Sequence, residues 1–242
     1  MAVTHERDLI IHNRNDPLLP HMPVSSMPIP FLSPLLPDLG ISFLDNMGAL
    51  GLTSTAAHTL SSILPLTAMI IESTIVSSPV SEPVDPIPST TIRAMAARLH
   101  GILASAPPEA DLVTQTIQLC ARILTASIST MQPISVVKTE AQSQTLYENI
   151  LAVGPKRWKE IPGIFLWILL VATPHPKEPP REVLETPGAM TRWELKKKYL
   201  VRKMATASQV ISQEDFMLGI VYLRGFLAVQ RFVVEAEDGG DE

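Results

Sequence analysis

The sequence contains little cysteine and little charge. Cys120 is its single cysteine, which excludes an internal disulfide, a multi-cysteine zinc site and a cysteine-ligated iron–sulfur cluster. Charged residues make up 18% of the 242 residues, below the ~25% of an average globular protein. Lys and Arg number 19 against 24 Asp and Glu, and the resulting net charge of -5 argues against a dedicated polyanion-binding protein.

The common motifs of catalysis and phosphate binding are also missing. The sequence has no Gly-X-Ser-X-Gly elbow, no glycine-rich dinucleotide or P-loop pattern, and no two histidines at helical spacing. Ser135 and Lys138 match the Ser-X-X-Lys pattern of penicillin-binding enzymes, but the companion motifs of those enzymes are absent. Glu109 and Asp111 are better explained as acids at a helix start. We therefore predict no catalytic residue, no metal site and no cofactor.

Proline, in contrast, is abundant and unevenly placed. There are 22 prolines against 11 glycines, and seven of the prolines fall within residues 1–46. Each proline removes a backbone donor, so a continuous helix is excluded there. We predict a proline-rich arm over residues 1–46, which is either extended and docked on the folded body or disordered. Proline clusters at 79–88 and 174–180 predict loops.

Between these loops, apolar residues recur at three- and four-residue steps, the pattern of amphipathic helices. We expect about seven helices and no strands, because no segment alternates between hairpin turns. The predicted fold class is all-α, an irregular helical bundle over residues 47–235 followed by an acidic disordered tail at 236–242. The expected helices lie at about 49–76 with a kink or break at Pro65, 89–106, 109–132, 138–153, 162–172, 190–211 and 215–235. In the last of these, the expected buried stripe is Phe216, Ile220, Leu223, Leu227 and Val234.

The most apolar run is Ile164–Ala172. With residues 161–163 it would form a helix of about 18 Å, well short of the ~30 Å hydrocarbon layer of a membrane. We therefore expect no membrane association but a central, buried helix, wrapped by the helices that start near Val113, Thr191 and Asp215. The N-terminus has no apolar run of signal-peptide length, which favours an intracellular protein.

One cluster of basic residues lies on the expected helix after residue 190. One interpretation is a phosphate- or partner-contacting face, or a nuclear import signal. The other is the solvated side of an amphipathic helix, because Trp193, Leu200 and Met204 occupy its opposite side. The residues of this cluster are Arg192, Lys196, Lys197, Lys198, Arg202 and Lys203.

Two segments resemble a known family. The run from Trp158 to Ala172, a Trp before an Ile-Pro-Gly turn and an apolar helix with a central Trp, resembles part of the fungal-specific transcription-factor-like domains. These are the helical regulatory regions that follow the binuclear zinc cluster of fungal regulators. The run from Tyr222 to Arg231 resembles the end of such a domain, so the likeness covers about residues 140–235. The residues that carry it are Trp158, Pro162, Gly163, Phe165, Trp167, Phe226, Gln230 and Arg231.

The single cysteine sets this chain apart from that family, whose DNA reader needs six cysteines for two zinc ions. The resemblance therefore implies a non-enzymatic regulatory domain without a DNA-reading head, in the nucleus or otherwise in the cytoplasm. Such a domain would not bind specific DNA sequences by itself, and would act through protein partners or a small apolar ligand. A truncated gene product, a paralogue that lost its head and a co-regulator all fit this description. Two alternatives stay open: a helical scaffold or oligomerisation protein, with a homo-oligomer included, and an enzyme with a pocket between helices.

Overall fold

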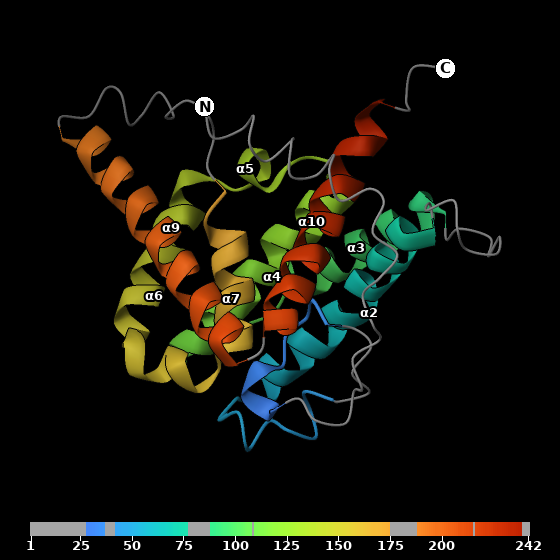
Figure 1. The fold of residues 1–242 in the computed structure, drawn as a ribbon. Coiled ribbons are helices and arrows are strands. Elements are labelled where there is room, and N and C mark those ends of the chain that lie inside the picture. Colours follow the sequence, from blue (N-terminus) through green and yellow to red (C-terminus); the bar gives the residue numbers. More distant parts are fainter. Residues whose placement is uncertain are drawn as a thin grey trace.

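The computed structural model describes residues 28–36, 42–76, 88–107, 109–174, 188–214 and 216–238. Over these ranges the chain forms eight α-helices, one 3-10 helix and no strand, which confirms the all-α class (Figure 1). Most of the predicted arm, at residues 1–27 and 37–41, and tail residues 239–242 lie outside the described residues. The elements are η3 Ile29–Phe31, α2 Ser54–Val76, α3 Ser89–Ala104, α4 Leu112–Thr130, α5 Ile134–Val137, α6 Glu140–Glu160, α7 Pro162–Ala172, α9 Ala189–Glu214 and α10 Phe216–Asp238.

Local chemistry explains several helix ends. Asp111 precedes α4, and its carboxylate accepts the backbone N–H of Thr114 at 2.8 Å, as an N-cap does. Thr139 and Gln142 form a reciprocal capping box at the start of α6. We expected α6 to end at Gly154. Gly154 does interrupt it with a φ of 78°, but helical turns resume and continue to Glu160.

The predicted start of the first long helix is wrong. We expected a helix from Ala49, but residues 43–51 form turns and α2 begins at Ser54. Gly51 has a φ of 58°, a left-handed conformation that would interrupt a helix. Arg157 of α6 then holds this turn region, because its Nη2 donates to the carbonyl oxygens of Leu50 at 2.6 Å and Gly51 at 2.7 Å.

Helix α7 lies in the middle of the bundle. All of its residues except Phe165 are buried, and it packs against α4, α6, α9 and η3 (Figure 1). The expectation that it is a central helix covered by α4 and α9 is therefore confirmed. Helix α10 packs chiefly against α9 and α2 instead, and shares with α7 a small hollow lined by Leu166, Leu170 and Leu223 among others. Helix α10 therefore covers α7 less than expected.

The buried face of α10 also differs from the expected one. Leu223 and Val234 are 52% and 47% exposed, whereas Tyr222, Val229 and Val233 are buried. Both sides of α10 carry apolar residues, so periodicity alone could not select the inner one. The side chain of Phe216 lies outside the described residues, and α10 continues through Asp238, past the predicted end at residue 235.

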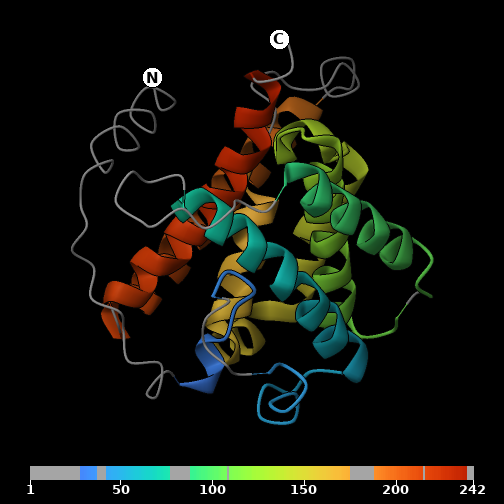
Figure 2. The ribbon, with the colours of Figure 1, turned by 90° about the vertical axis from the view of Figure 1, so that its right-hand side faces the viewer.

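Residues 28–36, here named the docking segment, lie against α2, α7 and α10 (Figure 2). The segment buries Leu32, Leu35 and Leu36. Its carbonyl groups are used as well: the hydroxyl of Tyr222 donates to Phe31 O, and the hydroxyl of Thr67 donates to Pro34 O at 2.5 Å. This part of the predicted arm thus completes the core.

Within the described residues, Ser54–Thr74 of α2 is long and apolar enough to cross a membrane, judged by length and composition only. Its buried residues include Leu60, Ile63 and Ile70, and α2 packs against α3, α4 and α10. The apolar helix that we singled out from the sequence, α7, is shorter, with 11 residues.

Candidate ligand pocket and basic helix face

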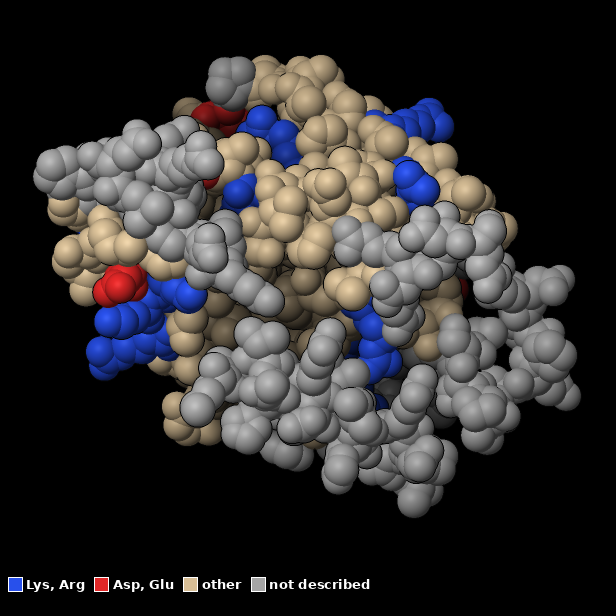
Figure 3. Space-filling view, turned by 90° about the horizontal axis from the view of Figure 1, so that it is seen from above, with Lys and Arg blue, Asp and Glu red and all other residues tan. Residues whose placement is uncertain are grey.

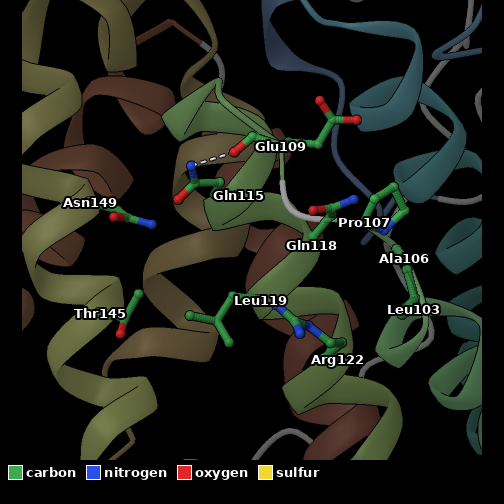
Figure 4. Close-up of a pocket in the computed structure, with 10 residues that line it drawn as sticks. All are labelled: Leu103, Ala106, Pro107, Glu109, Gln115, Gln118, Leu119, Arg122, Thr145 and Asn149. Atoms are coloured by element: carbon green, nitrogen blue, oxygen red, sulfur yellow. Dashed lines mark hydrogen bonds between the residues drawn. The ribbon is translucent and has the colours of Figure 1, made fainter.

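A pocket of about 370 Å³ lies between α3, α4 and α6 (Figure 4). The C-terminal end of α3 and the segment that follows it form one wall, α4 forms the floor, and α6 contributes two polar side chains. The pocket is lined by Leu103, Ala106, Pro107, Glu109, Gln115, Gln118, Leu119, Arg122, Thr145 and Asn149.

Several polar groups at this pocket lack partners. Asn149 is 8% exposed, and its side-chain Nδ2 is buried without a hydrogen-bond partner. Arg122 Nε is also buried without a partner, and no carboxylate of the described residues lies within 4.0 Å of its guanidinium. Figure 4 shows the amide of Asn149 directed from α6 toward α4, with Leu119 between it and the guanidinium of Arg122. Buried polar groups normally find partners, so these two mark the pocket as chemically unusual.

Other polar residues of the pocket are already engaged. Gln115 Nε2 donates to the carbonyl oxygen of Glu109 at 2.6 Å, and Thr145 Oγ1 donates to Ala141 O at 2.9 Å. The carboxylate of Glu109 points away from Arg122 in Figure 4. The unused hydrogen-bonding capacity is therefore concentrated on donors, and one of these donors carries a positive charge.

The sequence pattern alone did not predict this pocket. The signal available was the spacing of Gln115, Gln118 and Arg122, which lie three and four residues apart and so share one face of α4. Thr145 and Asn149 stand in the same relation on α6. Such a polar stripe is also typical of a solvated helix face, and only the packing of α4 against α3 and α6 encloses it.

The six basic residues of α9 do not form one continuous surface. Lys196 is 3% exposed and forms an ion pair with Glu140 of α6. Lys197 lies over the ring of Trp193 at 5.2 Å from its centroid, and Lys203 lies over the ring of Tyr199 at 5.4 Å. Lys196 thus links α9 to α6, whereas Lys197 and Lys203 contact rings of α9 itself, since a cation over an aromatic face is attracted to it.

The other three, Arg192, Lys198 and Arg202, are exposed. They share one side of α9 with the exposed side chains of Leu195 and Val201, and we name these five residues the outer face of α9. Glu194 lies beside them, 3.9 Å from Lys198 Nζ. Figure 3 shows Lys and Arg side chains gathered at the edge of the molecule where α9 lies.

The first family-like segment forms the turn between α6 and α7. Trp158 is buried, donates its indole N–H to Ile150 O at 3.0 Å, and stacks on Phe165 with ring centroids 4.8 Å apart. Pro162 is the first residue of α7, where a missing backbone N–H costs nothing. Trp167 is fully buried, and its indole N–H has no partner.

The second family-like segment lies on α10. Phe226 is half-buried and packs against the core, and Arg231 is half-buried. Gln230 has a buried Nε2 without a partner. The docking segment contacts both family-like segments, because it lies against Gly163 of α7 and Gly225 of α10.

A buried lysine from outside α7 binds the carbonyl groups at its C-terminal end. Lys138 Nζ donates to Ala172 O at 2.5 Å and Val171 O at 3.3 Å, so it satisfies carbonyl groups of the last helical turn. Burial lowers the pKa of Lys138 to about 7. Burial also raises the pKa of the Cys120 thiol far above its ordinary value, so Cys120 stays protonated. Cys120 occupies the apolar stripe of α4, where a small buried side chain is expected.

The part of the chain that the structure describes holds no group of three or more His, Cys, Asp or Glu side chains that could bind a metal ion. In the comparisons with known proteins, no family model, no curated protein and no solved structure matches this chain.

Proposed function

We propose that this chain is a non-enzymatic helical regulatory domain, similar to the regulatory region of fungal binuclear zinc cluster regulators, that acts in the nucleus through a protein partner. Its 242 residues contain no zinc cluster. Recruitment to DNA would then depend on the partner, which fits the net charge of -5.

The observation that carries the proposal is the position of the first family-like segment. The Trp158–Phe165 stack and the buried Trp167 lie where α6 turns into α7, and α7 contacts four other elements. A segment with this many neighbours is constrained by the packing of the whole domain. A shared Trp, Pro-Gly and Trp pattern at such a place supports a shared architecture, and the proposed function follows from that architecture by analogy.

The outer face of α9 is the surface that we propose for the partner. It presents two exposed apolar side chains, Leu195 at 59% and Val201 at 43% exposure, between exposed basic residues. Apolar groups within a charged rim are typical of protein–protein contacts. A partner with an acidic, partly apolar surface would complement this face.

The test is a tethered reporter assay. The full chain is fused to an unrelated sequence-specific DNA-binding domain, and reporter transcription is compared with that of the DNA-binding domain alone at equal protein level. We expect the fusion to change transcription. The double substitution Lys198→Gln and Arg202→Gln should weaken that change, because it removes two exposed charges of the proposed partner surface.

The matched control is Arg93→Gln with Arg98→Gln, which removes two exposed charges from α3 instead. The control should behave as the unmodified fusion does. A folded fusion that leaves transcription unchanged, together with no enrichment of the untethered chain at chromatin, would contradict the proposal.

The second candidate function, a helical scaffold or oligomerisation protein, is favoured by one observation. Leu223 and Val234 on α10 are about half exposed, and exposed apolar residues on one helix are a common contact between copies. Sedimentation velocity of the full chain, with Leu223→Ser as the variant, measures this. A stable oligomer that Leu223→Ser dissociates, combined with a silent reporter, would favour the scaffold over the regulator.

A further inference from the structure

We propose that the pocket between α3, α4 and α6 binds a small organic carboxylate, which pairs with Arg122 and forms hydrogen bonds with Asn149 and Gln118. The regulatory role of this ligand rests on the proposed function. Binding of the ligand to the pocket does not, because it can be measured on the purified chain alone. A polar ligand thus takes the place of the apolar one that the sequence suggested.

The positive charge of the pocket comes from Arg122, and Glu109, the acid that also lines the pocket, directs its carboxylate away from Arg122 (Figure 4). The Nε of Arg122 is buried without a partner, and within the described ranges no carboxylate lies within ion-pair distance of it. A guanidinium offers planar paired N–H donors that match the two oxygens of a carboxylate. Arg122 is half-buried as a whole, but a buried donor such as its Nε is costly without a partner, so an anionic guest that accepts from it would relieve that cost.

The hydrogen-bonding groups come from both α4 and α6. Asn149 is 8% exposed, and its unpartnered Nδ2 lies on the α6 side of the pocket that Arg122 lines from α4 (Figure 4). Gln118 is 6% exposed and lines the pocket with its carboxamide. An amide group both donates and accepts, so these residues suit a guest with a second polar end beyond its carboxylate.

The size of the pocket favours a metabolite-sized guest. Its volume of about 370 Å³ is at the small end of ligand pockets, which range over roughly 300–1,000 Å³. The apolar side chains of Leu103 and Leu119 would pack on the carbon atoms of the guest. The hollow of about 180 Å³ between α7, α9 and α10 is smaller than that range and lined mostly by apolar residues.

The test is calorimetric titration of the purified full chain with succinate, with succinamide as an uncharged probe of the same shape, and with inorganic phosphate. We expect succinate to bind and succinamide to bind roughly tenfold more weakly or not at all, because only succinate can pair with Arg122. Phosphate should bind more weakly than succinate, because it offers no second polar end to Asn149.

Two variants locate the binding. Arg122→Gln and Asn149→Leu should each reduce succinate affinity by roughly tenfold, whereas Arg93→Gln, an exposed arginine on α3, should not. Circular dichroism checks that each variant is folded, and Asn149→Leu keeps the test available if Arg122→Gln is not. The proposal is overturned if succinate does not bind, if succinamide binds equally well, if phosphate binds better than succinate, or if both pocket variants bind as the unmodified chain does. Failure of the reporter assay would contradict the proposed function without changing any of these binding results, so the two proposals can be told apart.

Discussion

The docking segment and the pocket use polar groups in opposite ways. Where the docking segment lies on α2, α7 and α10, its carbonyl oxygens accept hydrogen bonds from the hydroxyls of Tyr222 and Thr67. At the pocket, the amide of Asn149 and the Nε of Arg122 are buried without partners. Both regions are enclosed by several helices, so burial alone does not explain the difference.

This difference separates a region built for stability from one built for binding. Satisfied hydrogen bonds and close packing each contribute to the free energy of unfolding. Unpartnered buried donors subtract from it, and proteins keep such groups mainly where they serve a function. Substitutions in the two regions should therefore change stability in opposite directions.

The largest effect is expected for Gly163→Val. A Cβ at Gly163 would lie 2.6 Å from the carbonyl oxygen of Leu32, closer than real contacts allow, and the obstacle is backbone. The docking segment would have to lift from α7, at a cost of about 3 kcal/mol in unfolding free energy. Urea denaturation followed by circular dichroism measures this change.

The matched control for Gly163 is Gly101→Ala on α3. A Cβ at Gly101 meets nothing within 4 Å, and alanine is a better helix former than glycine. This control should gain about 0.5–1 kcal/mol. Equal behaviour of the two variants would show that the docking segment does not rest on Gly163.

The next largest effect is expected for Tyr222→Phe. The change removes only the hydroxyl that donates to Phe31 O, and leaves a buried carbonyl without its partner. We expect a loss of about 1–2 kcal/mol in unfolding free energy. Tyr147→Phe is the control, because the half-buried Tyr147 ring keeps its edge contact with Tyr199. A loss at Tyr147 as large as that at Tyr222 would remove the argument from the hydrogen bond.

The sequence predicted those parts of the fold that depend on local pattern. The stripe on α4 that includes Val113, Ile117 and Cys120 is buried, and the burial of α7 follows from its apolar composition. Helix α10 could not be predicted in the same way, because Leu223 and Tyr222 lie on different, similarly apolar sides. The Tyr222 side of α10 is buried because it packs against the docking segment. Tyr222 donates there to Phe31 O, 191 residues away in the sequence.

The candidate sites depended still more on distant residues. Lys196 looks like one more surface cation in the sequence, yet the structure buries it in an ion pair with the partly exposed Glu140, 56 residues away. Asn149 and Arg122 look like polar residues at the edge of two amphipathic helices. Only the packing of α4 against its neighbouring helices buries the Asn149 amide nitrogen and the Arg122 Nε, and a helical pattern carries no information about that packing.

At the C-terminal end of α7, away from the docking segment, the buried Lys138 should make stability depend on pH. Burial lowers the pKa of Lys138 to about 7, with Lys196 also lowering it and Glu140 opposing, whereas the unfolded chain has the ordinary value near 10.4. Between these values the unfolded chain binds more protons, so stability rises with pH. The neutral amine can still donate to Val171 O and Ala172 O.

The measurement compares unfolding free energies of the unmodified chain and Lys138→Met from pH 6 to 8.5. The difference should be flat below pH 7 and then shift in favour of the unmodified chain by up to about 1.4 kcal/mol per pH unit. Other titrating groups cancel in the comparison. A difference that stays flat across the whole range would mean that Lys138 remains charged inside the protein.

The smallest expected effect tests the pocket side of the comparison. Asn149→Leu replaces an unpartnered buried amide with an apolar side chain of similar size. Removal of a polar group that has no partner costs no hydrogen bond, so unfolding free energy should stay constant or rise by up to about 1 kcal/mol. The same variant should lose succinate affinity, so that stability and binding move in opposite directions at one residue. A loss of stability comparable to that of Tyr222→Phe would mean that Asn149 supports the fold as Tyr222 does, and the contrast between the two regions would disappear.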